Sequence, residues 1–290
     1  SILGSMYAEG HGVKRDYKEA IKWFVSAAKH NDALGQYNLG ELYAYGKGVP
    51  QNYKEAMKWY RLAAEQGDTK SQSILGEMYD FGRGVKQDYK KAIEWYLLAL
   101  EQNDPSAQSS LGLMYQYGHG VIQNYDEALR LFYLSAVQKD SYAQSNLGYM
   151  YSKGIGVEQD YKEAIKWYRL SAEQKNSTGQ YNLGKMYAEG KGVGKDYQEA
   201  IKLYTFAAEQ RNSEAQKALG DLYFSGEGVP EDHLLARMWY ELCISNQLDN
   251  SLNCIETLEN IMTSSQIEKA KELASKWRPA KDRRQSVRQR

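Results

Sequence analysis

The sequence is poor in the residues that most often carry chemistry. Its 290 residues include two cysteines and four histidines, with no His-Glu-x-x-His motif, no cysteine pair at zinc-binding spacing and no nucleophile motif. No apolar run is long enough to span a bilayer, and 37 basic residues balance 37 acidic ones. We therefore expect no catalytic centre, no cofactor, no metal site and no membrane span.

What the sequence does contain is a regular repeat. Leu-Gly pairs recur every 36 residues, with their glycines at Gly4, Gly40, Gly76, Gly112, Gly148, Gly184 and Gly220. A repeat of this size cannot bury a core alone, so adjacent repeats must stack and share one. The period predicts an all-α fold, a right-handed α-solenoid of antiparallel helix pairs.

The first helix of each repeat, called helix A, is marked at both ends. In one repeat Asp32 is a good N-cap, apolar residues follow at helical spacing, and Gly46 provides a left-handed stop. The Leu-Gly glycine lies inside helix A, where glycine costs about 0.5–1 kcal/mol relative to alanine. We expect the compensating gain to be close approach of the second helix.

The second helix, called helix B, follows a Gly-x-Gly-Val loop. Asn52 is expected to cap it, with Glu55 reaching back to complete a capping box. Helix B is expected to bury Tyr53, Trp59 and two alanines. The histidines of the loops, His11 and His119, are interpreted as solvated residues.

These landmarks support a family resemblance. The pattern Gln-x-x-Leu-Gly-x-Met/Leu-Tyr-x-x-Gly-x-Gly-Val-x-x-Asp/Asn-Tyr-x-x-Ala-x-x-Trp-Tyr-x-x-Ala resembles the Sel1-like repeat, a relative of the tetratricopeptide repeat, over residues 1 to about 246. The resemblance implies an adaptor module, as in bacterial signalling, envelope assembly, host-cell interaction or eukaryotic protein quality control.

The repeat divides the chain into three parts. Residues 1–246 hold seven repeats, the first truncated at its N-terminus, and residues 247–277 are predicted to form a divergent capping helix pair. Residues 278–290 form a basic tail, with six basic residues against one acidic, which we interpret as a solvated terminus without a nucleic-acid partner. Because the chain starts inside a repeat, we expect it to be a fragment. The compartment stays open, with an exported or secreted bacterial protein favoured.

Variable positions on helix A are the candidate partner-binding site. In tetratricopeptide relatives helix A lines the concave face, and the matching positions here vary although the rest of the repeat does not. These positions include Gln116 and Ser152, and the residues selected as the site are Tyr37, Glu41, Tyr45, Glu77, Asp80, Phe81, Leu113, Tyr117, Tyr149, Lys153, Tyr181 and Lys185.

The aromatic and apolar members of this set are typical of a groove for an extended peptide or a helix of another protein. Its acidic and basic members lie toward opposite ends of the sequence, and the resulting charge gradient would orient a ligand. The alternative is that the rings only pack between adjacent repeats.

The two cysteines leave two interpretations open. Cys243 ends the last repeat and Cys254 begins the capping pair, so the two would face each other in a helical hairpin. They form either a disulfide or two buried thiols.

We therefore predict a non-enzymatic, monomeric adaptor for protein partners. One alternative is a structural or self-associating subunit in which the tyrosine-rich positions meet a second copy. The other is a hydrolase-like enzyme, which would need a nucleophile and a base that the sequence does not reveal.

Overall fold

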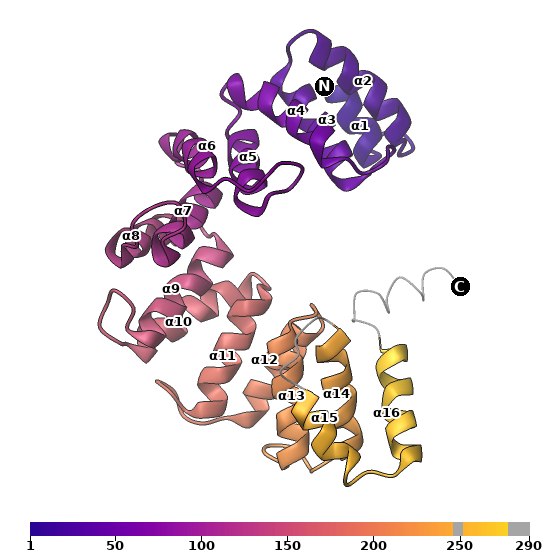
Figure 1. Cartoon of the computed structure of the whole chain (residues 1–290), viewed down its shortest axis with the longest axis vertical. Helices are drawn as coiled ribbons and strands as arrows, with labels where there is room; N and C mark the ends of the chain where they lie inside the picture. The colour runs from indigo at the N-terminus through magenta and orange to yellow at the C-terminus, as the bar shows by residue number, and fades with distance from the viewer. Residues whose placement is uncertain (246–251, 278–290) are drawn as a thin grey trace. The chain divides into compact units, whose positions relative to one another are not determined.

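The structure, a computed structural model, describes residues 1–245 and 252–277, and these residues form sixteen α-helices and no strand. The predicted all-α repeat fold is confirmed. The contacts divide the chain into two compact units, an N-terminal unit (Ser1–Gln138) and a C-terminal unit (Lys139–Arg290), which are described one at a time (Figure 1). The basic tail and the loop at 246–251 lie outside the described residues.

Helices A and B alternate in both units, with odd numbers for helices A and even numbers for helices B up to α14. The N-terminal unit contains α1 (Ile2–Glu9), α2 (Tyr17–Lys29), α3 (Ala33–Tyr45), α4 (Tyr53–Glu65), α5 (Thr69–Phe81), α6 (Tyr89–Glu101), α7 (Pro105–Tyr117) and α8 (Tyr125–Val137). The C-terminal unit contains α9 (Ser141–Lys153), α10 (Tyr161–Glu173), α11 (Ser177–Glu189), α12 (Tyr197–Ala208), α13 (Ser213–Ser225), α14 (His233–Ser245), α15 (Leu252–Glu259) and α16 (Ser264–Lys276). Within a unit each helix up to α14 packs against the next one along the chain, and α16 packs against α14. Helices α5 and α7, like α9 and α11, also contact each other.

The predicted caps set the bounds of helix A. The Asp32 side chain accepts a hydrogen bond from the Gly35 N–H, and Gly46 follows Tyr45 with a left-handed φ of 66°. Aspartate or asparagine caps α5, α7, α9, α11 and α13 in the same way, and a glycine ends every helix A.

The expected capping box of helix B is wrong. Asn52 does cap α4 by accepting hydrogen bonds from the Lys54 and Glu55 N–H groups, but its own N–H donates to the Tyr43 carbonyl of helix A. Glu55 therefore has no donor to reach back to, and instead it pairs with Lys58 on the next turn. A complete capping box is present at α16, between Thr263 and Gln266.

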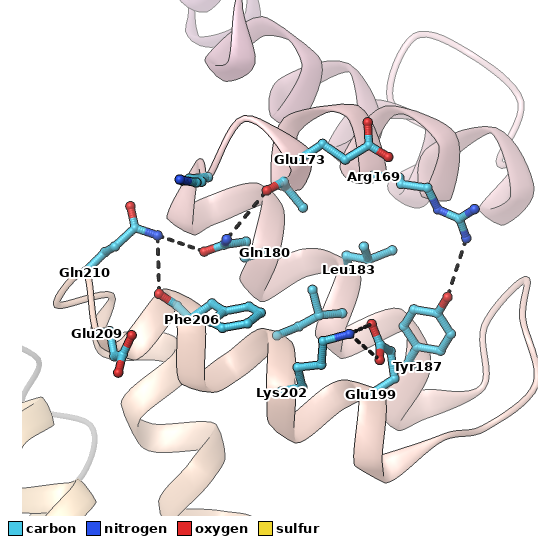
Figure 2. A pocket seen from close by; sticks show the side chains of 13 residues that line it. Arg169, Glu173, Gln180, Leu183, Tyr187, Glu199, Lys202, Phe206, Glu209 and Gln210 are labelled. Atoms are coloured by element: carbon cyan, nitrogen blue, oxygen red, sulfur yellow. Dashed lines mark hydrogen bonds and ion pairs between the residues drawn. The ribbon is translucent and has the colours of Figure 1, made fainter. Parts of the chain in front are cut away.

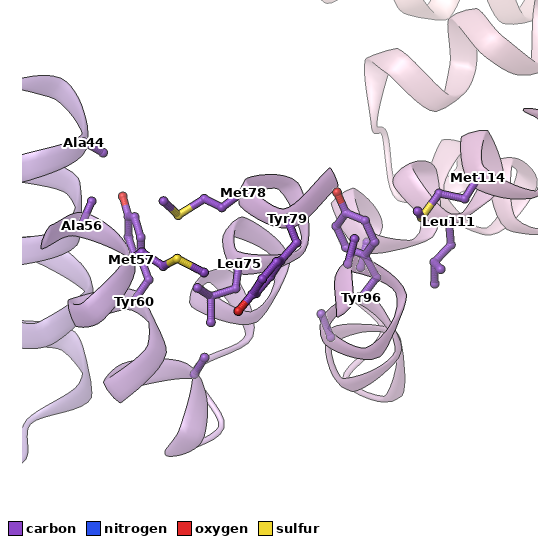
Figure 3. Packing of buried hydrophobic residues seen from close by; sticks show 14 of the residues in the cluster. Ala44, Ala56, Met57, Tyr60, Leu75, Met78, Tyr79, Tyr96, Leu111 and Met114 are labelled. Atoms are coloured by element: carbon purple, nitrogen blue, oxygen red, sulfur yellow. The ribbon is translucent and has the colours of Figure 1, made fainter. Parts of the chain in front are cut away.

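The aromatic residue that helix B buries is also different from the expected one. Tyr53 is exposed and Trp59 is only half-buried, whereas Tyr60 is 2% exposed. A Cβ on Gly40 would lie 2.6 Å from the Tyr60 ring, so the missing side chain of the Leu-Gly glycine is what admits the ring. The expected close approach of helix B is confirmed. Figure 3 shows Tyr60 in the shared core of the N-terminal unit, with Met57, Leu75 and Met78.

Buried glutamines form a second repeated contact, which the sequence analysis did not predict. In successive repeats a glutamine after helix B donates from Nε2 to the Oε1 of a buried glutamine in the preceding helix A, as Gln66 does to Gln36 at 2.7 Å. The same bond joins Gln102 to Gln72, Gln138 to Gln108, Gln174 to Gln144 and Gln210 to Gln180. Each bond satisfies a buried amide that would otherwise be costly.

Helices α15 and α16 lie within residues 247–277, where a helix pair was expected. Ile255, Leu258 and Met262 form a buried cluster with Ala236 and Tyr240 of α14. Residues at the end of α16 pack on another face of α14. The role of this pair as a cap stays a prediction.

Candidate protein-binding surface

Three aromatic rings of the predicted site occupy one repeated position in the N-terminal unit. Tyr45, Phe81 and Tyr117 are the last residues of α3, α5 and α7, and their side chains are 63%, 61% and 58% exposed. The glycine that follows each of them turns the chain away from the helix axis. The end of helix A therefore presents the ring to solvent instead of burying it between repeats.

A loop residue between the two glycines contacts each of these rings. The Lys47 ammonium lies 5.1 Å from the Tyr45 ring centroid, and the Arg83 guanidinium lies 5.1 Å from that of Phe81. In the fourth repeat the His119 ring lies 5.7 Å from Tyr117 and stacks on Tyr89 at 4.9 Å. His119 is exposed, as the sequence analysis expected, but its ring is part of an aromatic group.

Acidic side chains lie beside the rings. Glu41, Glu77 and Asp80 are half-buried, and Glu41 accepts a hydrogen bond of 2.9 Å from the Tyr60 hydroxyl. Burial raises the pKa of Glu77 and of Asp80, since a carboxylate is less well solvated there than in water. Burial, followed by the Glu41 charge, raises the pKa of Tyr37 to about 12.

The structure brings three of the predicted residues around one small cavity. Glu41, Tyr45 and Glu77 line a cavity of about 90 Å³ between α3 and α5, together with Arg83. This volume is enough for one or two methyl groups but not for a large side chain.

Leu113 lies at the repeat position of Glu41 and is half-buried. Where Glu41 faces the Tyr60 hydroxyl, the fourth repeat has Leu113 and Phe132, neither of which carries a polar group. In the C-terminal unit the polar pair returns, with the Tyr240 hydroxyl donating to Asp221 at 2.8 Å. The repeat that holds Leu113 and Phe132 therefore offers an apolar surface next to Tyr117.

In the C-terminal unit the structure brings together Tyr149, Lys153, Tyr181 and Lys185. All four line one cavity of about 320 Å³ between α9 and α11. Tyr149 is 37% exposed, Tyr181 and Lys185 are half-buried, and Lys153 is exposed. The Lys185 ammonium lies 3.8 Å from Glu189, which reduces its contribution to the expected positive charge.

One of the variable positions is not on the surface. Gln116 and Ser152 are buried, and the Ser152 hydroxyl contacts the Tyr168 hydroxyl at 3.2 Å and donates to the Tyr149 carbonyl. This position faces helix B, so its side chain belongs to the packing between the two helices of a repeat. Asp80 occupies the same position, and its half-burial has the same cause.

The two cysteines are thiols and not a disulfide. Cys243 is buried in α14 and Cys254 is half-buried in α15. Cys254 is therefore more exposed than the interpretation of two buried thiols expects.

Residues 1–245 and 252–277 contain no group of three His, Cys, Asp or Glu side chains placed to hold a metal ion. No helix in this part of the chain combines the length and the apolar character that a bilayer span needs.

Comparisons with known proteins agree on the repeat. The Sel1 repeat model matches residues 2–32, 33–68, 69–104, 105–140, 141–176, 177–212 and 213–243. No curated protein sequence gives a significant match.

Solved structures give closer comparisons. A Sel1 repeat protein from Oxalobacter formigenes is 33% identical, with a TM-score of 0.77 and a match covering 85% of this chain and 99% of that one. The protective antigen c5321 of uropathogenic Escherichia coli, which displays the same repeat fold, is 32% identical with a TM-score of 0.60 over 94% of this chain and 66% of that one. The immunity protein Pa5087 of Pseudomonas aeruginosa shares the fold at 20% identity and a TM-score of 0.53, over 75% and 83% of the two chains.

The family model covers most of the chain, and the repeat positions that it matches are those that form the helix pairs of the structure. The chain therefore belongs to the Sel1 repeat family, whose members are generally non-catalytic scaffolds for protein interactions.

Proposed function

We propose that the chain is a non-enzymatic adaptor that holds an extended peptide or a helix of another protein against its helices A. The observation that carries this proposal is the row of exposed rings at Tyr45, Phe81 and Tyr117. Other helices A end in Glu9, Lys153, Glu189 or Ser225, so the fold does not require a ring at this position. Aromatic residues with no packing role are the typical anchors of a protein interface.

The acidic residues add a chemical preference to the row. Burial raises the pKa of Glu77 and Asp80, so each carboxylate is incompletely solvated and would gain from a nearby cation. Lys47 and Arg83 already lie over two of the rings. We infer that the N-terminal unit favours a partner segment that alternates apolar side chains with lysine or arginine.

The cavity of the C-terminal unit serves as a second contact region in this proposal. Tyr149, Lys153, Tyr181 and Lys185 surround a volume large enough for one partner side chain. Three lysines and one glutamate line this cavity, so it favours a polar or acidic group, the reverse of the preference of the N-terminal unit.

A double substitution tests the proposal. Tyr117→Ala with Tyr149→Ala should weaken capture of the partner at least tenfold, since interface anchors lose about 2 kcal/mol or more on truncation. Affinity capture with the intact chain, read by mass spectrometry, would identify the partner, and calorimetry would then give the affinities of both proteins. Helicity and Tm should not change, because both rings lie outside the shared core.

The matched control is Tyr133→Ala on helix B, where the tyrosine is also about half exposed. Capture that survives the double substitution, or a large drop in Tm, would contradict the proposal. Light scattering at two concentrations tests the alternative that the chain associates with itself. A dimer that forms with the intact chain and not with the double variant would show that the occupant of this surface is a second copy.

A further inference from the structure

A second cavity lies between two helices B and the helix A that joins them, and it is lined by none of the residues proposed above. It has a volume of about 670 Å³ and is formed within the C-terminal unit by α10, α11 and α12. Figure 2 shows Leu183 and Phe206 directed into it, with charged residues around its edge. Ala172 and Leu203 complete its apolar surface, and Phe206 is 45% exposed although nothing in the fold requires a ring there.

One residue of this cavity differs from its counterpart in most other repeats. Leu203 occupies the helix B position that holds tryptophan in five other repeats, at Trp23, Trp59, Trp95, Trp167 and Trp239, and Leu131 is the other leucine at this position. Replacing an indole by an isobutyl group leaves space on this face of α12. The cavity at the corresponding face of α4, lined by Met57 and Leu62, is smaller, at about 350 Å³.

One repeat further along, the chain covers the corresponding residues with its own helix. Ala172, Leu183, Leu203 and Phe206 correspond, at a distance of 36 residues, to Ala208, Leu219, Trp239 and Leu242. These four form one buried cluster, against which Leu273, Ala274 and Trp277 at the end of α16 pack.

The coverage by α16 is close. The Trp277 ring meets the Trp239 ring edge-on at 5.8 Å, and Trp239 and Leu242 are each only 8% exposed. The contrast with the exposed Phe206 shows what this face looks like with and without a helix on it.

The sequence of α16 shows what kind of helix such a face accepts. Ile267, Ala270, Ala274 and Trp277 follow the three-to-four-residue spacing of an amphipathic helix, and five of the seven residues between Ile267 and Trp277 that lie off this face are lysine or glutamate. The edge of the cavity likewise carries both signs of charge, from Arg169 and Lys175 to Glu173 and Glu209. Mixed charge on both sides suits a helix whose polar face carries lysines and glutamates.

We propose that the cavity formed by α10, α11 and α12 is a docking site for an amphipathic helix of another protein, which inserts an aromatic side chain between Leu183 and Phe206. The occupant is assigned to a different protein because α16 of each copy already covers its own α14. The site is independent of the helix A residues and would allow the adaptor to hold two partners at once.

A peptide of known sequence can probe the site. A fluorescein-labelled peptide with the sequence of residues 263–277, added to the full chain, should bind saturably in an anisotropy titration. Phe206→Glu in the chain, or replacement of the tryptophan of the peptide by alanine, should weaken binding at least tenfold. Leu62→Glu, at the same position of α4 and similarly exposed, should change it less than twofold.

A second variant avoids the addition of a charge. Leu203→Trp introduces the residue that five other repeats carry, so it should fill the cavity with the fold intact and weaken binding to the same degree. Absence of saturable binding would overturn the proposal. Binding that neither Phe206→Glu nor Leu203→Trp weakens would also overturn it, because the peptide would then bind elsewhere, for example on α14 in place of α16. A concentration-dependent dimer that Phe206→Glu abolishes would also overturn it, since the occupant would then be a second copy.

Discussion

At the scale of single residues, a close contact recurs in each repeat between the Leu-Gly glycine and a ring of helix B. A Cβ at position 112 would lie 2.7 Å from a ring carbon of Phe132, and one at position 76 would lie 2.4 Å from Tyr96. These distances are shorter than any normal carbon contact, so a side chain at the glycine would force the ring or the helix to move. The glycine therefore sets the spacing of the two helices.

Gly112→Ala should lower the Tm. Overpacking costs about 1–3 kcal/mol, which exceeds the gain of about 0.5–1 kcal/mol that alanine brings to a helix interior. Thermal unfolding followed by circular dichroism measures the change. An unchanged or higher Tm would show that the Phe132 ring moves aside at little cost.

The matched control for this change is Gly194→Ala. Gly194 lies in a loop with no atom within 4 Å of the position of its Cβ, and other repeats have Pro50, Lys86 or Glu158 there. Alanine should leave the Tm unchanged or raise the stability by about 0.4–1 kcal/mol, because it restricts the unfolded chain.

The sequence predicts some of these single-residue features and not others. The exposure of Tyr45, Phe81 and Tyr117 could be predicted, because their identity varies while the core positions of the repeat stay constant. The burial of Tyr60 in place of Trp59 could not, since the two are adjacent and both apolar, and only the helix spacing at Gly40 decides which ring enters.

At the scale of elements, one buried charge joins α14 to α15. Arg237 is 1% exposed, at a position where other helices B have Ile201, Ile165 or Met57. Its Nη2 donates to Glu241 on α14 at 3.0 Å and to Glu259 on α15 at 2.9 Å. Its Nε and Nη1 are buried with no hydrogen-bond partner among the described residues, which is an unfavourable arrangement for a cation.

A double-mutant cycle measures this attachment. Glu259→Ala should destabilise α15 by about 1–3 kcal/mol, because it leaves the buried guanidinium with one partner fewer. Arg237→Ile should be neutral or stabilising, since a well-packed apolar residue replaces a poorly satisfied buried cation. Urea unfolding gives the change in the free energy of unfolding for each variant. Hydrogen exchange of the α15 amides shows whether the change is confined to α15.

The combined variant decides between the ion pair and a general effect at this position. In the Arg237→Ile background, Glu259→Ala should cost almost nothing, because the glutamate no longer has a buried partner. An equal cost in both backgrounds would show that Glu259 stabilises α15 in another way.

Helix bounds could be predicted from the sequence because caps are local chemistry. Asp32 and Gly46 act on the few backbone groups next to them, and neither depends on the tertiary fold. The capping box at Glu55 fails because its hydrogen-bond donor is already bound to Tyr43, nine residues earlier along the chain. The cavity at Leu203 escapes prediction for a similar reason, since its volume depends on three helices together.

At the scale of the whole molecule, the repeats predict the fold and the balance of charge predicts behaviour in solution. Residues 278–290 carry six basic residues and one acidic, so the rest of the chain has five more acidic than basic residues. The formal charge of the whole chain is zero at neutral pH. Molecules without net charge repel one another least, so solubility should be lowest near pH 7.

Removal of residues 278–290 should therefore raise solubility at pH 7. The shortened chain would carry a formal charge of minus five, and its pH of lowest solubility should move to the acid side because some carboxylates must then be protonated to reach neutrality. Light scattering as a function of pH measures both effects. A full-length variant with the six basic residues of this segment changed to glutamine separates charge from length, and it should lie close to the shortened chain, with a formal charge of minus six. If that variant behaves like the unmodified chain, contacts made by the segment, and not its charge, determine the solubility.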